Sequence, residues 1–514
     1  MKRFLLMLLV CAMLAACLAG CAEQPGPATE PVSGSSASGS SSGTSSDTAP
    51  QGGADDAPRY DAKGYLMDDL PSDLNFDADI RVLHWTEADL FNPDKDETAF
   101  VDHSVYTRNL NVEDRLGITF EWVPAQGHWP SEQSFLTNVQ NAYINGEQSR
   151  YDIIATYSQT AGLISTQGLV IDLYSVDHID LEKPWWPSSL TADFTIGDKL
   201  WFASGDVSPA FLGEMVGVLF NKTLLKNDNL YELVYDGTWT QDKMLELAKN
   251  FYVDLNDSEK KDTGDRFGIV IPWYIYLDAF FYASDLITVE NNDDHLLCVS
   301  STYVSEKADN LSEVLKTFFH KTDDGLLADG EENIHIFANG RSAFMVCPGA
   351  TIMGTMSMRE TRVEYGVVPV PKYDADQKEY KTTITNLYSL YTIFAGSTKE
   401  QANRAGAVIE CLASEGYRTV SPMVFEVCLK TRYTNDDDSA KMYDIIHDGV
   451  VFDVGRVFSR SALKDITQSR WQRCVIDGDK VWGAMSATID AQMQNLLDNL
   501  METFNNLPDP FIES

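Results

Sequence analysis

Residues 79–157 alternate between strand-like and helix-like patterns, and this alternation limits the fold more than any other feature of the chain. Strand patterns at 79–85, 118–122 and 151–157 enclose helical patterns that run to about 116 and over 131–143. The third strand, YDIIATY, is apolar almost throughout, as expected for a strand covered on both faces. A β-α-β-α-β order requires right-handed crossovers and therefore predicts a mainly parallel sheet.

Ligands of such sheets bind beyond the carboxyl ends of the strands. The residues that follow the first and third strands are therefore the first candidates for ligand contact: Trp85, Glu87, Tyr157 and Gln159. Another strand pattern, at 266–271, is followed at once by three aromatic residues that are hard to bury together: Trp273, Tyr274 and Tyr276. An aromatic side chain after a strand more often packs in a core, and that alternative stays open for each of these residues.

The amino terminus predicts export. Lys2 and Arg3 precede a short apolar run at 4–18, and small residues follow before Cys21. This order is typical of a secretory signal peptide. The run Leu-Ala-Gly-Cys resembles a bacterial lipobox, which implies cleavage before Cys21 and lipidation of that cysteine; a plain cleaved signal is the alternative. Residues 24–58 are rich in Gly, Ser, Thr, Pro and Ala, a composition that predicts a flexible tether.

The remaining length and the charge exclude several classes of function. About 455 residues are left for folding, enough for two or more domains. The net charge of −38 becomes −40 when the two cations Lys2 and Arg3 leave with the signal. Such a chain repels nucleic acid and anionic lipid, so neither is an expected partner. Scattered acidic residues are usually a solvated surface, although they also allow a cationic ligand.

The cysteines after Cys21 do not form a recognisable framework. They are odd in number and widely spaced, namely Cys298, Cys347, Cys411, Cys428 and Cys474. We expect most of them to be buried as small apolar residues. One disulfide bond remains open as an alternative, and its connectivity does not follow from the sequence.

Four segments resemble the extracellular solute-binding proteins of ABC importers, of the family 1 or sugar type. At 336–372 a turn at Asn339–Gly340, a strand, Gly349 and a later strand ending among prolines resemble the family's F-x-x-G-[KR]-[SA]-A-[MF] and G-V-x-P-x-P segments. The strand VGVLFN before Lys222, with the later TWTQD and an amphipathic helix, is similar to another family segment. A capping box at 397–400 opens a helix expected to stop at Gly416, and NLYSLYTIF, which contains Tyr388, precedes it.

This resemblance covers roughly residues 78–510 and implies an α/β fold of two lobes. Each lobe would be a mainly parallel sheet flanked by helices, with a ligand cleft between the lobes. The implied organisation is a signal peptide at 1–20, a lipidated cysteine and tether at 21–77, a first lobe from 78–190 with 341–388, and a second lobe from 191–340 with 389–514. Hinges are expected near 187–200, 336–345 and 386–394. The spacing of apolar residues at 489–504 predicts a final amphipathic helix.

Motifs for catalysis are not recognisable in this sequence. It contains no G-x-S-x-G, H-E-x-x-H, Walker A or G-x-G-x-x-G pattern, and its eight His residues do not fall at metal-ligand spacing. We therefore expect no cofactor, no metal and no enzymatic activity. A glycosidase needs only two carboxylates at the right separation, so a chain with 77 acidic residues leaves that alternative open.

A sugar site needs aromatic platforms for C–H faces and carboxylate, amide or Arg partners for hydroxyl groups. The sequence 453–458 resembles the sugar-type members of the family and contributes Asp453 and Arg456. The full set of candidate ligand-binding residues is Trp85, Glu87, Tyr157, Gln159, Trp273, Tyr274, Tyr276, Asp278, Gly349, Tyr388, Asp453 and Arg456.

The resemblance implies a monomeric, lipid-anchored receptor on the outer side of a bacterial cytoplasmic membrane. It would capture a small solute, expected to be a sugar and in particular an oligosaccharide, and deliver it to the membrane subunits of an ABC permease. Two alternatives stay open. The same receptor could bind a cationic or peptide-like solute, or the chain could be a surface glycoside hydrolase or adhesin.

Overall fold

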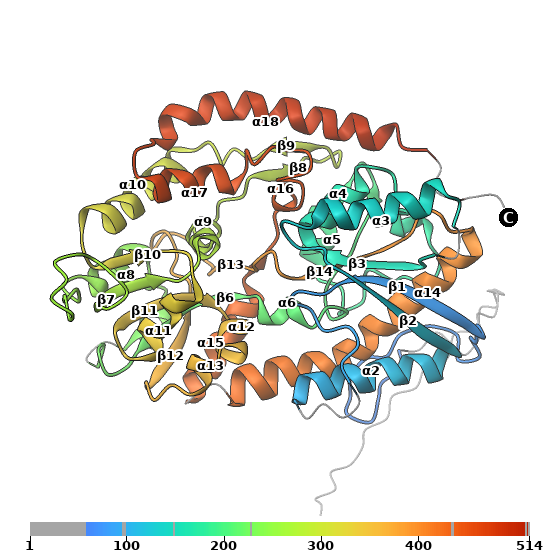
Figure 1. Ribbon diagram of the computed structural model, residues 1–514, viewed down its shortest axis with the longest axis horizontal. Coiled ribbons are helices and arrows are strands. Elements are labelled where there is room, and N and C mark those ends of the chain that lie inside the picture. Colours follow the sequence, from blue (N-terminus) through green and yellow to red (C-terminus); the bar gives the residue numbers. More distant parts are fainter. Residues whose placement is uncertain are drawn as a thin grey trace, which may run out of the picture. The chain divides into compact units, whose positions relative to one another are not determined.

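The computed structural model describes residues 58–94, 99–147, 150–226, 229–432, 436–508 and 511. The predicted signal peptide, Cys21 and most of the predicted tether lie outside the described residues. Figure 1 shows two sheets with helices packed around them. Buried apolar side chains form one continuous core that extends through both sheets, with a small separate cluster at Phe267, Val270 and Ile336.

The first sheet has the strand order β14-β3-β1-β2. Its strands are β1 (Ala78–Trp85), β2 (Ile118–Ala125), β3 (Ile153–Tyr157) and β14 (Ser389–Ile393). β1 is parallel to β2 and β3, and β14 is antiparallel to β3. Helices α2 (Phe100–Leu116) and α3 (Glu132–Ile144) make the connections, and every residue of β3 is buried. The predicted β-α-β-α-β unit with parallel strands is thus confirmed. We refer to this sheet and its helices as the first lobe.

The second sheet has the order β10-β7-β11-β6-β12. Its strands are β6 (Val216–Asn221), β7 (Phe267–Ile271), β10 (Gly325–Leu327), β11 (Ser342–Pro348) and β12 (Tyr365–Pro369). β7 is parallel to β10 and β11, whereas β6 is antiparallel to β11 and β12. Four of the five strands therefore run in the same direction and β6 runs opposite to them, so the second sheet is mainly parallel, as expected. We refer to this sheet and its helices as the second lobe.

The strand pairing differs from the expected grouping of 341–388 with the first lobe and 389–514 with the second. β11 and β12 belong to the second sheet, while β14 belongs to the first. The physical reason is the burial of β11: all seven of its residues are buried, so the strand needs a neighbour on each side, and β7 and β6 supply them. The chain thus leaves the second sheet after β12 and returns to the first sheet over 370–388. The expected grouping had placed this return before β11.

The other elements connect or cover the two sheets. In chain order they are α4 (Ser158–Ser165), η1 (Leu173–Ser175), α5 (Ser188–Phe194), β4 (Thr195–Ile196), β5 (Lys199–Leu200), α6 (Ala210–Gly213), α7 (Leu230–Tyr235), α8 (Gln241–Ala248), η2 (Tyr274–Leu277), α9 (Asp278–Ala283), β8 (Val289–Asn291), β9 (Leu297–Val299), α10 (Glu306–Lys321), η3 (Glu331–Asn333), α11 (Ile334–Ala338), α12 (Gly349–Gly354), α13 (Met356–Arg359), β13 (Thr382–Thr383), α14 (Lys399–Glu415), η4 (Gly416–Val420), η5 (Met423–Arg432), α15 (Asp437–Asp448), β15 (Val450–Val451), α16 (Val454–Val457), α17 (Gln468–Asp477) and α18 (Trp482–Asn505). The predicted final amphipathic helix is α18. Within the described part of the chain, no helix combines the length and apolar character needed to cross a bilayer.

Helix α14 begins and ends differently from the sequence prediction. Its capping box is formed by Thr398 and Gln401, one residue later than predicted, with Thr398 N donating to Gln401 Oε1 over 2.9 Å. The helix does not stop at Gly416 but continues into the π-helical segments η4 and η5. Gly416 has helical dihedral angles, and a Cβ there would lie 2.0 Å from the carbonyl oxygen of Asp206. This glycine therefore permits a close approach of two backbones rather than a helix end.

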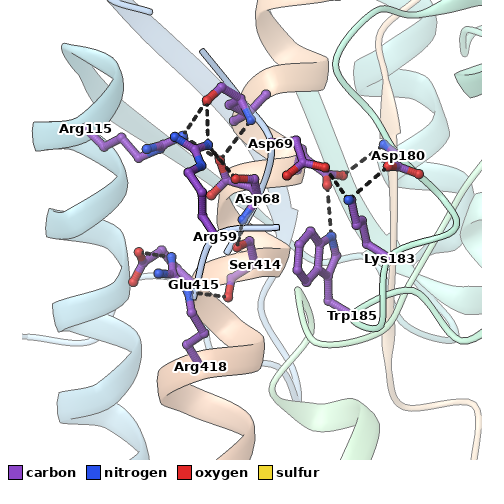
Figure 2. Close-up of polar contacts among 12 residues, drawn as sticks. Arg59, Asp68, Asp69, Arg115, Asp180, Lys183, Trp185, Ser414, Glu415 and Arg418 are labelled. Carbon is purple, nitrogen blue, oxygen red and sulfur yellow. Dashed lines mark hydrogen bonds and ion pairs between the residues drawn. The ribbon is translucent and has the colours of Figure 1, made fainter. Parts of the chain in front are cut away.

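Residues 58–70, expected to be part of the tether, instead pack against the first lobe. Figure 2 shows Arg59 and Arg115 converging on Asp68, whose side chain is fully buried. Arg115, from α2, donates to the Asp68 carboxylate and to the carbonyl oxygen of Leu70. Arg59 donates to the carbonyl oxygens of Asp68 and Leu70 over 2.6 and 2.9 Å. Asp68 N donates to Ser414 Oγ of α14 over 3.1 Å, so the segment joins α2 to α14.

We expect Asp68→Ala to lower the free energy of unfolding by about 2–4 kcal/mol, because it leaves Arg115 facing a buried site without its carboxylate. Urea denaturation followed by circular dichroism measures this change. Asp73→Ala, at an exposed position three residues beyond this segment, is the matched control and should change stability by less than about 0.5 kcal/mol. Equal effects of the two substitutions would contradict a structural role for the buried contact.

Candidate ligand-binding site

A cavity of about 650 Å³ lies where the strand ends of the two lobes meet. The first lobe contributes residues that follow β1 and residues at the start of α2. The second lobe contributes α12 and α13, and α6 and η5 complete the wall. Its lining side chains include those of Asp89, Leu90, Val101, Ala210, Glu214, Ala350, Met353, Arg359 and Val424. The lining is mostly apolar with a few charged groups, which is the usual character of a small-molecule site.

Asp89 joins three segments at the edge of this cavity. Its Oδ2 accepts hydrogen bonds from Ser208 Oγ and Ser389 Oγ, each over 2.6 Å, and its Oδ1 accepts from Ala210 N over 3.0 Å. Trp85 Nε1 donates to the same Ser389 Oγ over 2.7 Å. Burial raises the pKa of the Asp89 carboxyl, and these hydrogen bonds oppose that rise. Asp89 therefore fixes the loop after β1 against α6 and β14.

Glu214 is the second buried acid of the cavity. Its Oε2 accepts a hydrogen bond from Thr385 Oγ1, and its carbonyl oxygen accepts from Thr385 N over 3.0 Å. Burial raises the pKa of the Glu214 carboxyl to about 7, with the negative charge of Asp89 adding to the rise. Near neutral pH this carboxyl can therefore either donate or accept a hydrogen bond to a ligand hydroxyl group.

A buried row of four polar side chains, none of them in the lining of this cavity, crosses from one lobe to the other; we call it the polar row. It consists of Tyr157, Gln159, Arg456 and Asp278. Tyr157 OH donates to Gln159 Oε1 over 3.3 Å, and Gln159 Nε2 donates to the carbonyl oxygen of Arg456 over 3.3 Å. Arg456 forms an ion pair of 3.8 Å with Asp278, the first residue of α9. Burial raises the pKa of Asp278 to about 6, although Arg456 lowers it.

Arg456 is also held by residues of the segment 370–388, which crosses between the lobes. Its guanidinium donates to Thr383 Oγ1 over 2.6 Å and to the carbonyl oxygen of Ile384 over 2.8 Å, and it lies over the ring of Tyr282. Asp453 does not reach the cavity. Its carboxylate caps α16 by accepting from Gly455 N, and it also accepts from Tyr282 OH over 2.9 Å. Asp453 therefore positions the helix that carries Arg456.

The remaining predicted residues have different surroundings. Trp85 is fully buried, with its ring centroid 5.5 Å from that of Tyr157. Glu87 is exposed, and its carboxylate accepts from Gly127 N over 3.1 Å. Tyr388 is buried against Phe211.

The aromatic run after β7 turns into the short helix η2. Trp273 and Tyr274 are half-buried, and Tyr276 is buried. Tyr274 N donates to Asp329 Oδ1 over 3.0 Å, and its carbonyl oxygen accepts from Gln472 Nε2. Gly349 begins α12 behind Ala350, where a Cβ would lie 2.9 Å from Leu429 Cδ2. The structure thus joins four of the twelve predicted residues in the polar row, and none of the twelve is in the lining of the cavity.

Sequence reasoning missed Asp89 and Glu214. Asp89 lies four residues beyond the end of β1, and it could have been found by extending the search along that loop. Glu214 precedes β6, whose amino-terminal end pairs with the carboxyl end of β11, since Val216 lies opposite Pro348. A search restricted to residues after strands therefore passes over it. The antiparallel direction of β6 would have been needed to find it.

Two groups of predictions concern metals and cysteines. Across the residues that the structure describes, no three His, Cys, Asp or Glu side chains are grouped so that they could hold a metal ion. Among the residues that the structure describes, no disulfide bond joins the five cysteines beyond Cys21; four of them are buried and Cys298 is half-buried. This agrees with the expectation that most are small buried residues. Burial raises the pKa of the Cys474 thiol to about 11, as expected of an inert cysteine.

No protein-family model matches this chain, and no curated protein matches it in sequence. Its fold is similar to that of solved solute-binding proteins. The maltose/maltodextrin-binding domain MalE from Bdellovibrio bacteriovorus, bound to maltotriose, has a TM-score of 0.51 and 15% identity, covering 82% of this chain and 100% of that one. A cyclo/maltodextrin-binding protein complexed with maltotetraose has a TM-score of 0.52 and 16% identity, covering 82% and 96%.

The GacH receptor of Streptomyces glaucescens, solved unliganded and with acarbose, has a TM-score of 0.50 and 12% identity, covering 82% and 99%. These likenesses, together with the two sheets, define the class of the fold: this chain has the two-lobed α/β fold of periplasmic and extracellular solute-binding proteins. The fold implied by the sequence resemblance is thereby confirmed.

We expect the stability of the protein to depend on the ionisation of Glu214. The folded carboxyl has a pKa of about 7, well above the ordinary value of 4.5, so the folded state holds a proton that the unfolded chain has lost. Stability therefore falls as pH rises between these two values, and the full penalty is present above pH 7. Glu214→Gln should remove this penalty, on the order of 3 kcal/mol.

The measurement is urea denaturation of wild type and Glu214→Gln from pH 4 to pH 8. The variant should gain stability relative to wild type as pH rises. Glu246→Gln, at an exposed glutamate of α8, serves as the control and should follow wild type at every pH. A constant difference between wild type and Glu214→Gln across this range would show that Glu214 does not titrate as proposed.

Proposed function

We propose that this protein is the lipid-anchored binding component of an ABC importer and that it captures a carbohydrate between its lobes. The observation that carries this proposal is the cavity at the junction of the two strand-end edges, in a chain with the fold of solute-binding proteins. Proteins of similar fold were solved with maltotriose, maltotetraose and acarbose. The proposal is that this chain likewise binds a sugar.

The chemistry of the cavity supports a sugar more than an apolar ligand. Glu214 offers a carboxyl that can donate or accept near neutral pH, and Arg359 of α13 offers a cation in the same lining. Hydrogen bonds to charged groups contribute about 1.5–3 kcal/mol each. Apolar side chains such as Met353 and Val424 also line the cavity, as the C–H faces of a sugar ring require.

Capture would follow from closure of the lobes. A ligand that touches both lobes favours the closed state only by its difference in affinity for the two states. Shifting such an equilibrium from mostly open to mostly closed takes on the order of 5 kcal/mol, which a few hydrogen bonds to charged groups supply. The polar row contributes to closure from the protein side, because Gln159 of the first lobe donates to the backbone that carries Arg456.

The lipid anchor and the permease partner are proposed from the sequence. The signal pattern before Cys21 favours export and lipidation at that cysteine, which would hold the protein at the outer face of a bacterial cytoplasmic membrane. The loaded, closed protein would then dock on the membrane subunits of a permease and release its solute unchanged. We propose binding rather than hydrolysis because the Asp89 carboxylate is occupied by hydrogen bonds from Ser208, Ser389 and Ala210.

One observation favours a second candidate. The cavity contains the buried carboxyls of Asp89 and Glu214, and a protein with a net charge of −38 attracts cations. A cationic or peptide-like solute would fit the same receptor role. It would pair with the carboxylate form of Glu214, so its binding would weaken as pH falls below about 7, the pKa of that carboxyl.

Thermal unfolding of the purified protein with a panel of ligands tests these candidates. We expect linear oligosaccharides to raise Tm and to be recovered intact by chromatography. Glu214→Ala should weaken binding of the active sugar by about tenfold or more, since one hydrogen bond to a charged group is lost. Glu246→Ala is the matched control and should bind as wild type does. A shift in Tm given by polyamines or peptides alone, or cleavage of the sugar, would overturn the proposal.

The polar row makes a separate prediction about closure. Arg456→Ala removes the ion pair to Asp278 and the bonds to Thr383 and Ile384, and we expect the unliganded protein to become more open. Small-angle X-ray scattering measures this as a larger radius of gyration without ligand. Saturating sugar should return the variant towards the wild-type value. Arg473→Ala, at an exposed arginine of α17, is the control; an unchanged radius in Arg456→Ala would contradict a role in closure.

A further inference from the structure

The segment 58–70, which joins α2 to α14, has a defined shape of its own. Asp61 Oδ1 accepts a hydrogen bond from Tyr65 N over 2.9 Å, and Asp61 N donates to the Tyr65 carbonyl oxygen over 2.9 Å. Met67 N donates to the Arg59 carbonyl oxygen over 2.8 Å, so the segment folds back on itself. These bonds fix the backbone at Tyr65, whose side chain is half-buried.

The Tyr65 side chain packs where α14 passes into the π-helical turn η4. Its ring meets the ring of Tyr417 edge-on, with 5.6 Å between the centroids. Tyr417 is the second residue of η4, and the centroid of its ring lies 6.0 Å from that of Trp185. The rings of Tyr65, Tyr417 and Trp185 thus form a line, which we call the aromatic row. It connects the amino-terminal segment to η4 and to the loop at 180–187.

Trp185, at the far end of the aromatic row, is firmly held. It is fully buried, and its Nε1 donates to Glu410 Oε1 of α14 over 3.1 Å. Trp186 Nε1 donates to the other oxygen of the same carboxyl over 3.0 Å. In the same loop Lys183 forms an ion pair with Asp69 of the amino-terminal segment (Figure 2). The segment therefore reaches this loop through an ion pair as well as through the aromatic row.

The aromatic row lies where two connections between the lobes touch each other. Residues 204–215 form the first crossing, because Ala203 before them pairs with β14 of the first sheet and β6 of the second sheet follows. In this crossing Asp206 N donates to the Trp185 carbonyl oxygen over 3.2 Å. Ser421 Oγ, directly after η4, donates to Asp206 Oδ1. The first crossing and the helical connection from α14 to η5 are thus joined at η4.

A π-helical turn is rare in proteins and occurs mostly at functional sites, so η4 is the natural bending point of its helical connection. Rotation of one lobe against the other would shift η4 relative to the parts of the first lobe that surround it. The contact between Tyr65 and Tyr417 would then be lost, and its contribution to stability with it. The amino-terminal segment therefore favours the arrangement of the lobes seen in the structure.

We propose that the segment 58–70 is a brace on the hinge, which holds η4 in place through the aromatic row and so limits the separation of the two lobes. This inference goes beyond the proposed function and needs only that the lobes can separate. If Cys21 carries a lipid, as proposed above, the brace also lies on the stretch of chain that connects the anchor to the hinge.

Double electron–electron resonance between spin labels on the two lobes tests the brace without any ligand. The labels are attached through Asn138→Cys in α3 and Glu246→Cys in α8, which are both exposed positions. Every protein also carries Cys21→Ser and Cys298→Ser, because Cys298 is the half-buried cysteine. The measured quantity is the ratio of long to short distances between the labels.

Tyr65→Ala should raise this ratio about fivefold, the change expected when one aromatic pair is lost from the closed arrangement. Tyr65→Phe keeps the ring and should behave as the parent protein does. Tyr60→Ala, at a residue of the same segment whose side chain is 63% exposed, is the matched control. Asp69→Ala, which removes the ion pair to Lys183, should raise the ratio by about twofold and serves as a second variant if Tyr65→Ala does not fold.

The outcomes separate the brace from the proposed function. An unchanged distance distribution in the folded variants would overturn the brace and leave the receptor role standing. The same increase in Tyr60→Ala as in Tyr65→Ala would also overturn it, because the effect would not depend on the aromatic row. If the protein binds no sugar, the proposed function fails, whereas the distances still decide the brace. Thermal unfolding establishes that each variant is folded.

Discussion

The carboxylate of Asp89 holds three separate stretches of chain in one place: the loop after β1, the start of α6 and the start of β14. The first stretch belongs to the first lobe, and the second lies on the crossing towards the second lobe. Trp85 reaches the same point through Ser389, so the end of β1 is fixed as well. Burying the Asp89 carboxylate is unfavourable by itself. The hydrogen bonds that it accepts from Ser208, Ser389 and Ala210 together offset that cost in free energy. The walls of the cavity that Asp89 lines depend on that arrangement.

The local elements of the fold could be predicted from the sequence, whereas the assignment of strands to lobes could not. The alternation of strands and helices at 79–157 is enough to predict a parallel sheet. Strands joined by helical crossovers can be arranged in only a few topologies. The stretch at 336–372 carried no such local signal. The membership of β11 in the second sheet is decided by its partners β6 and β7, which lie far away in the sequence. Helix α14 likewise passes Gly416 because a neighbouring backbone, at Asp206, comes close to it.

The candidate site was predictable only in part, and the reason is strand direction. Tyr157, Gln159, Asp278 and Arg456 meet in the polar row, as residues near strand ends should. Glu214 lies at the same edge of the second sheet, yet it precedes its strand because β6 runs antiparallel to β11. The sequence also showed which aromatic residues follow strands, but it did not show which of them are buried. Trp85 supports the core, and Trp129, which the search over strand ends did not reach, is the exposed one.

The long helical segment from α14 through η5 contacts elements of both lobes. α14 packs on α2 and β14, and η5 packs on α15, which covers β12 (Figure 1). Any rotation of one lobe against the other must therefore bend or twist this single rod. Its π-helical turns have wider rings and weaker geometry than an α-helix, so they yield first. The protein thus contains an elastic element that ends in the wall of its cavity, where Val424 of η5 lies, and the stiffness of that element helps to set how readily the two lobes can separate.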